Sequence, residues 1–499
     1  MRAIISVSDK SGLADFIRPI SGRFEEIYAS SGSLKALSDA GIRASRISDL
    51  TGFDSLLGGR VKTLHPALYA GILSERDEKS NSELVKFGFM NFDMVVVNLY
   101  PFWEHSSGTD VSSMVENIDV GGVSLLRAAA KNFAHVASIV DRSDYGPVGE
   151  EIRETGKISE ETRKRLAVRA FMETARYDSM IQGTLERVLM GRDSVTVPDL
   201  SRPVSLRYGE NPDQRAILYP DGSGNGIPGS IKLGGKELSY NNIVDADSAL
   251  DTIMEFEEPA AVIVKHATPC GVASSTTLKD SFVRALRGDP ESAYGSVIAV
   301  NREVDRETAE EMSRLFVEVI SAPGYSEESL GILRKKKNLR ILKTSMIPDP
   351  RMRLRSISHG ILAQSPLSSG FSGLDHVGGP EAHENLISDM EFAWKVVAHC
   401  RSNAVLLAKG GATIAIGGGQ TSRVEALRIA LRKAGTEAGG AVMASDGYLP
   451  FDDSIRIAAE SGISAVIQPG GSIRDKDSIA AANELSIPMY FTHKRVFLH

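Results

Sequence analysis

Two short segments of this chain combine basic side chains with turn residues, a pattern typical of sites for anionic ligands. The first, GRVKTLHP, carries Arg60, Lys62 and Thr63 between glycine-rich and apolar sequence. The second, VKHATPCG, places Lys265 and His266 side by side after an apolar run. Such groups grip a polar substrate and stabilise negative charge that develops on an oxygen. Because the segments lie far apart in the chain, we predict two anion-handling sites on two domains, acting consecutively on one substrate.

Lys265 and His266 can address one ligand only where the strand that carries them ends and bends, since neighbouring side chains of a regular strand face opposite sides. The sequence Thr-Pro-Cys-Gly that follows is expected to supply the bend. An imidazole suits a general base near neutral pH, and the lysine can tune it or donate a proton. The alternative is a solvated strand edge; the strand-end position favours catalysis.

The partners expected for GRVKTLHP are Tyr100, which ends an apolar run, and the segment IDVGGVSLLRAAAKN. In that segment Asp119 precedes a glycine pair, and a helix over Val123–Lys131 is predicted. That helix is about 13 Å long. Asp119 and Lys131 therefore share a site only if the loop folds back or the long lysine reaches. The alternative for GRVKTLHP itself is a solvated basic loop.

Two further motifs, SVSDK and SSGS, place hydroxyls and turn residues between an expected strand and an expected helix. They carry Ser8 and Lys10, and Ser30 and Ser33. Backbone N–H groups at a helix N-terminus, together with these hydroxyls and the lysine, are suited to holding a phosphate. Serine caps are common, so either motif alone is more often structural. Their expected place on one sheet edge favours phosphate binding.

The segment ATIAIGGGQTSR predicts a strand, a glycine-rich turn and a helix from Val424. Arg423 is expected to pair with a phosphate there. The spacing is neither that of a Walker A loop nor a clean dinucleotide fingerprint, so the signal is weak alone. Asn403, just before an apolar run, can hydrogen-bond an amide.

Composition limits the class of protein. A chain of 499 residues exceeds what one hydrophobic core usually supports, so two or three domains are expected. The net charge of −7 argues against a general nucleic-acid binder. Cys270 and Cys400 are too few for a disulfide framework, and Pro269-Cys270 lacks the second cysteine of a P-C-x-x-C zinc signature. A catalytic metal is therefore not expected. No apolar stretch approaches 18 residues, so we predict a cytoplasmic protein without a membrane partner.

Alternating strand and helix patterns predict an open α/β domain over roughly the first 190 residues. The expected strands there include Ala3–Val7, Phe24–Ala29 and Met94–Leu99. Residues 191–205 are polar and proline-containing, as in a linker. A second α/β region follows, with a loop-rich stretch at 347–383, and no internal repeat is evident by eye.

Taken together, the motifs resemble a known family. They occur in family order from end to end: VSDKSGL, GRVKTLHP, VVVNLYPF, ENIDVGG, LLRAAAKN, LRYGENPDQ, KELSYNN, VKHATPCG, FAWKVVAHCRSNAVLLAK, IGGGQTSR, SDGYLPF and IQPGGSIRD. The chain is similar to the bifunctional purine-biosynthesis family that joins aminoimidazole-carboxamide ribonucleotide formyltransferase to inosine-monophosphate (IMP) cyclohydrolase. Departures include SSGS for S-G-G-T and HATP for H-A-N-P; none removes a proposed catalytic residue.

The resemblance implies a methylglyoxal-synthase-like cyclohydrolase domain at 1–195. It also implies a formyltransferase at 196–499, built from two cytidine-deaminase-like α/β subdomains without zinc, with a break near 347–385. The implied co-substrate is 10-formyltetrahydrofolate, and the implied partner is a second copy in a homodimer. By motif, Lys265 and His266 carry formyl transfer, with substrate held by Arg207, Tyr208, Asn403 and Arg423. The residues that the resemblance implies for cyclisation are Lys62, Tyr100, Asp119 and Lys131, with Arg60 and Thr63. Those that it implies near the phosphate are Ser8, Lys10, Ser30 and Ser33.

Two alternatives stay open at this point. The first domain can be a regulatory sensor that binds a nucleotide without turning it over. The second half can be a zinc nucleoside deaminase, although the missing zinc ligands disfavour it.

Overall fold

The computed structural model describes residues 1–499 except 101, 103–110, 192–202, 222 and 450. The chain divides into two compact units, Met1–Arg202 and Pro203–His499. The domain boundary expected between residues 195 and 196 lies outside the described residues.

Within the described part of the first unit, five strands form a parallel sheet in the order β3-β2-β1-β4-β5. Its elements are β1 Arg2–Val7, α1 Leu13–Ile17, η1 Arg18–Arg23, β2 Glu26–Ala29, α2 Ser31–Asp39, β3 Ser45–Arg46, α3 Ile47–Thr51, η2 Leu57–Gly59, α4 Pro66–Leu73, α5 Glu78–Lys86, β4 Met94–Asn98, α7 Val111–Glu116, α8 Gly121–Lys131, β5 Ala137–Ile139, η3 Arg142–Asp144, α9 Tyr145–Thr155 and α10 Glu160–Met190. The predicted open α/β fold is confirmed.

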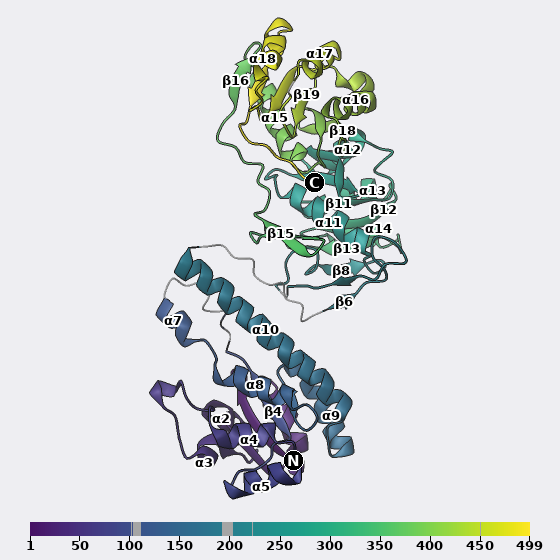
Figure 1. Ribbon diagram of the computed structural model, residues 1–499. Helices are drawn as coiled ribbons and strands as arrows, with labels where there is room; N and C mark the ends of the chain where they lie inside the picture. The colour runs from purple at the N-terminus through teal and green to yellow at the C-terminus, as the bar shows by residue number, and fades with distance from the viewer. Residues whose placement is uncertain (101, 103–110, 192–202, 222, 450) are drawn as a thin grey trace. The chain divides into compact units, whose positions relative to one another are not determined.

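Both faces of this sheet are covered by helices. Along β4, Met94 and Val96 join one apolar core, while Val95 and Val97 join another on the opposite face. That double burial explains the unbroken β-branched run in the sequence. In Figure 1 the long helix α10 runs alongside α8, which itself packs on β4 and β5. The winding reverses between β1 and β4, and ligands of such sheets bind at the carboxyl ends of strands beside that reversal.

In the described part of the second unit, twelve strands form one sheet, in the order β16-β21-β20-β19-β17-β18-β10-β9-β11-β12-β13-β8. Its elements are β6 Val204–Ser205, β7 Ile217–Leu218, β8 Ile231–Gly234, α11 Tyr240–Ile253, β9 Ala260–Lys265, β10 Thr268–Ser274, α12 Leu278–Gly288, β11 Ser296–Val300, α13 Arg306–Met312, β12 Val317–Ala322, α14 Glu327–Leu333, β13 Arg340–Lys343, β14 Arg353–Ile357, β15 Gly360–Gln364, β16 Asp375–Gly378, α15 Glu384–Val397, β17 Val405–Lys409, β18 Ala412–Gly417, α16 Arg423–Ala434, η4 Gly435–Ala438, β19 Val442–Ser445, α17 Asp453–Glu460, β20 Ala465–Gln468, α18 Asp475–Glu484 and β21 Met489–Phe491.

This unit contains an internal repeat that was not evident in the sequence by eye, although the resemblance implied two like subdomains. The run β8-α11-β9-β10-α12-β11-α13-β12-α14-β13 recurs as β16-α15-β17-β18-α16-β19-α17-β20-α18-β21. The strand order of the second half mirrors that of the first about the antiparallel pair β10–β18. Figure 1 shows the halves as a teal part and a yellow-green part. The small hairpin β14–β15 falls in the stretch expected to be loop-rich.

Candidate active sites

The first cluster lies where β1 and β2 end. The Ser30 hydroxyl precedes α2 and hydrogen-bonds that of Ser33 at 3.2 Å. Lys10 donates to the Ser8 carbonyl at 2.6 Å, and its side chain passes over Gly32 in the first turn of α2. The structure therefore brings SVSDK and SSGS together at a helix N-terminus, which is an arrangement suited to a phosphate.

Ser33 differs from its neighbours, because it is fully buried. Its hydroxyl accepts the main-chain N–H of Val7 at 3.0 Å and the hydroxyl of Ser30. Its hydroxyl is thus used within the protein, where it fixes the end of β1. Its place near a phosphate stays a prediction.

Asn98, at the end of β4, is a site residue that the sequence argument missed. Its Oδ1 accepts the main-chain N–H groups of Ser8 and Asp9, and its Nδ2 donates to the Asp9 carbonyl at 2.8 Å. One side chain thus ties the SVSDK loop to the neighbouring strand at the reversal point. The signal for it was a lone amide at the end of an otherwise apolar run.

A second cluster forms around the start of α8. A Cβ on Gly121 would lie 2.4 Å from the Thr63 hydroxyl, and one on Gly122 would lie 2.4 Å from an Asp119 carboxylate oxygen. Only glycine permits these approaches, so the glycine pair is what lets GRVKTLHP and Asp119 share one place. Lys62 is exposed and folds back over Gly59.

The environment of Asp119 suits a proton carrier. Burial raises the pKa of this carboxyl, while hydrogen bonds from the N–H groups of Gly122 and Tyr100 and the charge of Lys62 hold the rise back. The Gly122 bond is 2.7 Å long. The Asp119 N–H itself donates to the Tyr177 hydroxyl at 2.8 Å. Burial raises the pKa of Tyr177 to about 12. A carboxylate whose pKa is raised toward neutrality is a candidate general base.

Arg60 stands at the rim of this second cluster. Its guanidinium forms an ion pair with Glu116 at 2.6 Å, and both side chains are largely exposed. Exposed pairs of this kind are weak and exchange readily. Arg60 therefore lies near the site, and its weak ion pair with Glu116 leaves the guanidinium able to exchange partners.

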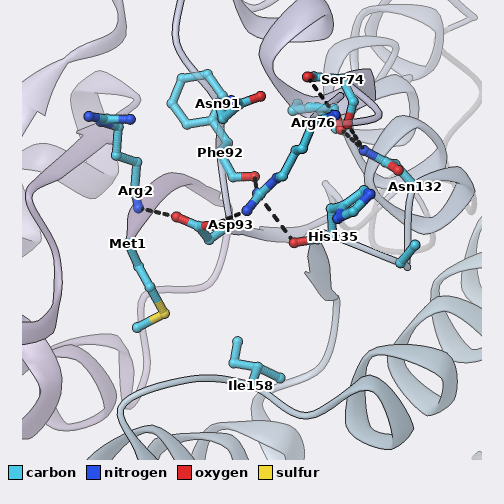
Figure 2. A network of polar contacts seen from close by, with 12 residues as sticks. Met1, Arg2, Ser74, Arg76, Asn91, Phe92, Asp93, Asn132, His135 and Ile158 are labelled. Atoms are coloured by element: carbon cyan, nitrogen blue, oxygen red, sulfur yellow. Dashed lines mark hydrogen bonds and ion pairs between the residues drawn. The ribbon is translucent and has the colours of Figure 1, made fainter. Parts of the chain in front are cut away.

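Lys131 does not join Asp119 within one chain. The two residues flank the eleven-residue helix α8, which is about 16 Å long. Figure 2 shows the polar network beyond the far end of α8, where Asn132 bonds main-chain carbonyls and Arg76 pairs with Asp93 at 2.9 Å. Asp93 directly precedes β4, so this network lies at the amino ends of the strands. The expectation that Lys131 reaches the Asp119 site is not met by this chain alone.

Gly122→Ala is expected to lower the rate of cyclisation about 100-fold, because the new methyl group must displace the Asp119 carboxylate. A catalytic group displaced by about 1 Å lowers the rate by about that factor. The matched control is Gly146→Ala in α9, where a Cβ meets nothing within 4 Å. Steady-state rates with a formylated intermediate check this. Equal activity of the two variants would show that Asp119 needs no such packing.

The Lys265–His266 pair lies at the tip of the β9–β10 hairpin. Lys265 is the last residue of β9, and its Nζ donates to the Tyr294 carbonyl at 2.9 Å. His266 and Ala267 both have a φ of 55° and make the turn themselves. The bend expected at Thr-Pro-Cys-Gly is therefore wrong, because those residues belong to β10. Positive φ costs a non-glycine residue about 1–2 kcal/mol, so the turn holds an exposed histidine at a cost typical of functional positions.

The pairing of β10 with β18 brings motifs of the two halves together. A Cβ on Gly418 would lie 3.9 Å from the Thr268 methyl group, so the glycine-rich loop adjoins the His266 turn. Asn403 binds this loop, since its N–H and its Nδ2 both donate to the Gln420 carbonyl at 2.9 Å. Asn403 is thus linked to the His266 turn through this loop, and its hydrogen bond to a substrate amide stays a prediction.

Arg423 has a different environment from the predicted one. Its guanidinium donates to Asp446 at 2.9 Å, and Asp446 is fully buried. Asp446 also accepts the Ser402 hydroxyl at 2.6 Å. In the structure the charge of Arg423 is paired with Asp446, and its pairing with a phosphate stays a prediction.

Arg207 and Tyr208 lie on a loop before β7. The guanidinium of Arg207 stands 5.5 Å from the centre of the Tyr208 ring. Asn241, near the start of α11, donates to the Glu210 carbonyl at 3.2 Å and fastens this loop to the helix. The loop that carries Arg207 and Tyr208 is therefore attached to α11, the helix that packs on β9.

Within the described residues, no three His, Cys, Asp or Glu side chains are grouped so that they could hold a metal ion. None of the described helices combines the length and apolar character needed to cross a membrane.

Comparisons with known proteins agree with this architecture. The family model described as "AICARFT/IMPCHase bienzyme" matches residues 129–433, and the "MGS-like domain" model matches residues 12–124. The bifunctional purine biosynthesis proteins PurH of Ruminiclostridium cellulolyticum and Acetivibrio thermocellus are 43% and 44% identical, with 100% of this chain and 99% of each relative covered. A crystal structure titled ForH is 34% identical over 38% of this chain and 98% of its own, with a TM-score of 0.36.

Fold, clusters and matches define a two-part α/β enzyme whose first part is a methylglyoxal-synthase-like domain, as expected. The chain belongs to the AICARFT/IMPCHase bienzyme family. It is accordingly a bifunctional enzyme of purine biosynthesis, with the formyltransferase and cyclohydrolase activities of IMP synthesis.

Proposed function

We propose that residues 196–499 perform the formyl transfer and residues 1–195 the ring closure. The observation that carries the first assignment is the strained hairpin turn that presents His266 beside Lys265. The amine of 5-aminoimidazole-4-carboxamide ribonucleotide attacks the formyl carbon of 10-formyltetrahydrofolate. His266 takes the amine proton, the bond from that carbon to N10 breaks, and Lys265 helps protonate the departing tetrahydrofolate nitrogen. Arg207, Tyr208, Asn403 and Arg423 hold the ribonucleotide, Arg423 through its place beside Asp446.

The second step is assigned to the Asp119 cluster. The carboxamide nitrogen attacks the new formamide carbon, and Lys62 with Tyr100 stabilises the oxyanion that forms. Asp119 takes a proton from the attacking nitrogen and passes it to the oxygen. The C–O bond then breaks, the former formamide nitrogen gives up its N–H proton as the ring C=N bond forms, and the oxygen leaves as water with both protons. Ser8, Lys10 and Ser30 with the N-terminus of α2 bind the phosphate. Arg60 and Thr63 border the same cluster, and Lys131 has no assigned contact within one chain.

The test of the whole assignment is direct. The purified chain, incubated with the aminoimidazole ribonucleotide and 10-formyltetrahydrofolate, is expected to produce IMP. Production of the formylated intermediate alone would support the alternative that the first unit only senses a nucleotide. Failure of both steps would reject the proposal.

A homodimer that works in the cytoplasm is also proposed. The hairpin β14–β15 supports an interface between copies, because Ile357, Ile361 and Leu362 are exposed along it. Both cysteines are free thiols, which suits a reducing compartment.

A further inference from the structure

The His266 turn has a counterpart in the second half of the same unit. The β17–β18 hairpin occupies the place of β9–β10 in the repeat, and its turn is made by Gly410 and Gly411. Their φ angles are 59° and 73°, against 55° for both His266 and Ala267. Two successive positive φ angles are what a two-residue hairpin turn demands, and glycine is the usual solution. The second half has that solution, whereas the first has a histidine and an alanine.

A partly buried carboxylate binds each turn from the helix before the hairpin. Asp389 of α15 accepts the N–H groups of Gly410 and Gly411, each at 2.7 Å. Asp245 of α11 accepts the N–H of Ala267 at 2.7 Å, and the N–H of His266 also points at it. Each aspartate precedes the first turn residue by the same number of positions, twenty-one. The contact is therefore part of the repeat and not a chance pairing.

The preceding lysine is repeated as well. Lys409 donates to the Gly439 carbonyl at 3.0 Å, as Lys265 does to the Tyr294 carbonyl at 2.9 Å. Lysine and aspartate are thus common to both halves, and the histidine is the element that distinguishes the first. In the first half the Asp245 carboxylate must stabilise a strained turn, because positive φ is unfavourable for His266 and Ala267.

We propose that Asp245 is a positioning residue for formyl transfer, which holds the His266 turn in the geometry that presents the imidazole to the substrate amine. This rests on the proposed role of His266. The Ser248 hydroxyl, one turn further along α11, supports the same turn by donating to the Ala267 carbonyl at 3.2 Å. Asp245 itself makes no contact with substrate.

The test compares Asp245→Asn with Asp389→Asn, which removes the same charge from the glycine turn. Asp245→Asn is expected to lower kcat of formyl transfer about 10- to 100-fold with KM for the ribonucleotide within about twofold. Asp389→Asn is expected to keep kcat within about twofold. Adding Ala267→Gly to Asp245→Asn is expected to restore much of kcat, because glycine relaxes the turn. Equal kcat for the two single variants, or no gain in the double variant, would overturn the inference.

Two controls separate the possible failures. If His266→Ala abolishes formyl transfer while Asp245→Asn keeps the rate of the unchanged protein, only this inference fails; if His266→Ala is fully active, the proposed function fails first. Should Asp245→Asn melt well below Asp389→Asn, Asp245→Glu replaces it. That variant keeps the charge but displaces the turn by one methylene, so kcat is expected to fall, and an unchanged kcat would equally reject the inference.

Discussion

His266→Ala is expected to abolish formyl transfer while leaving ring closure of added formylated intermediate at its normal rate. The substrate amine is a poor nucleophile, because the ring carboxamide withdraws its electron density. Removing the group that takes its proton costs about 10²- to 10⁴-fold. Because we assign ring closure to residues of the other unit, its rate is expected to stay unchanged.

The chain offers a matched control for this substitution. His359 is also an exposed histidine with positive φ, 62°, in the β14–β15 hairpin turn. His359→Ala makes the same change at a similar positive φ without touching the proposed site, so both activities are expected to stay within about twofold. Both rates are measured on the full chain by following formylated intermediate and IMP separately. Loss of both activities in His266→Ala would contradict two separate sites.

The strands were the most predictable part of the fold. The runs at Ala3–Val7 and Met94–Leu99 are apolar and β-branched because helices cover both faces of the sheet. The turn of the second site was not predictable in the same way. His266 and Ala267 have no turn propensity, whereas Pro269 and Gly271 do, and only the pairing of β9 with β10 shows which pair bends.

Contacts between distant segments were beyond the sequence argument. The side chains of Asn98 and Asp245 bind main-chain groups far along the chain, and Asp446 pairs with Arg423. No local sequence pattern predicts these contacts. The internal repeat was hidden for a related reason. Each half needs only apolar residues at equivalent core positions, so the two sequences can diverge while strand order and hairpin geometry stay the same.

At the cyclisation site the length of α8 raised a difficulty that the sequence left open. Asp119 and Lys131 were expected to share a site only if the loop folds back or the lysine reaches, and the structure places the two at opposite ends of that helix. The sequence showed the glycine pair only as following Asp119, whereas its structural function is close approach. Gly121 and Gly122 leave room for Thr63 and the Asp119 carboxylate, which is a packing fact that only coordinates reveal.

Lys62→Ala is expected to slow cyclisation about 10²- to 10³-fold, the usual effect of removing one group that stabilises an oxyanion. Formyl transfer is expected to keep its rate. A second effect follows from the charge: Lys62 lowers the pKa of Asp119, which burial raises. Without the lysine the pKa of Asp119 rises further, so more of the carboxyl is protonated at a given pH. Because the base must be ionised, the acidic limb of the pH profile is expected to move to higher pH.

Lys62→Arg separates the two effects. It keeps a positive charge beside Asp119, so the acidic limb is expected to stay in place, while the bulkier guanidinium fits the oxyanion less well and the maximal rate still falls. The measurement is kcat/KM for the formylated intermediate across the pH range for all three proteins. A Lys62→Ala variant that makes IMP at the normal rate would remove Lys62 from the mechanism. A slowed variant with an unmoved limb would keep the lysine but place the proton transfer on a group other than Asp119.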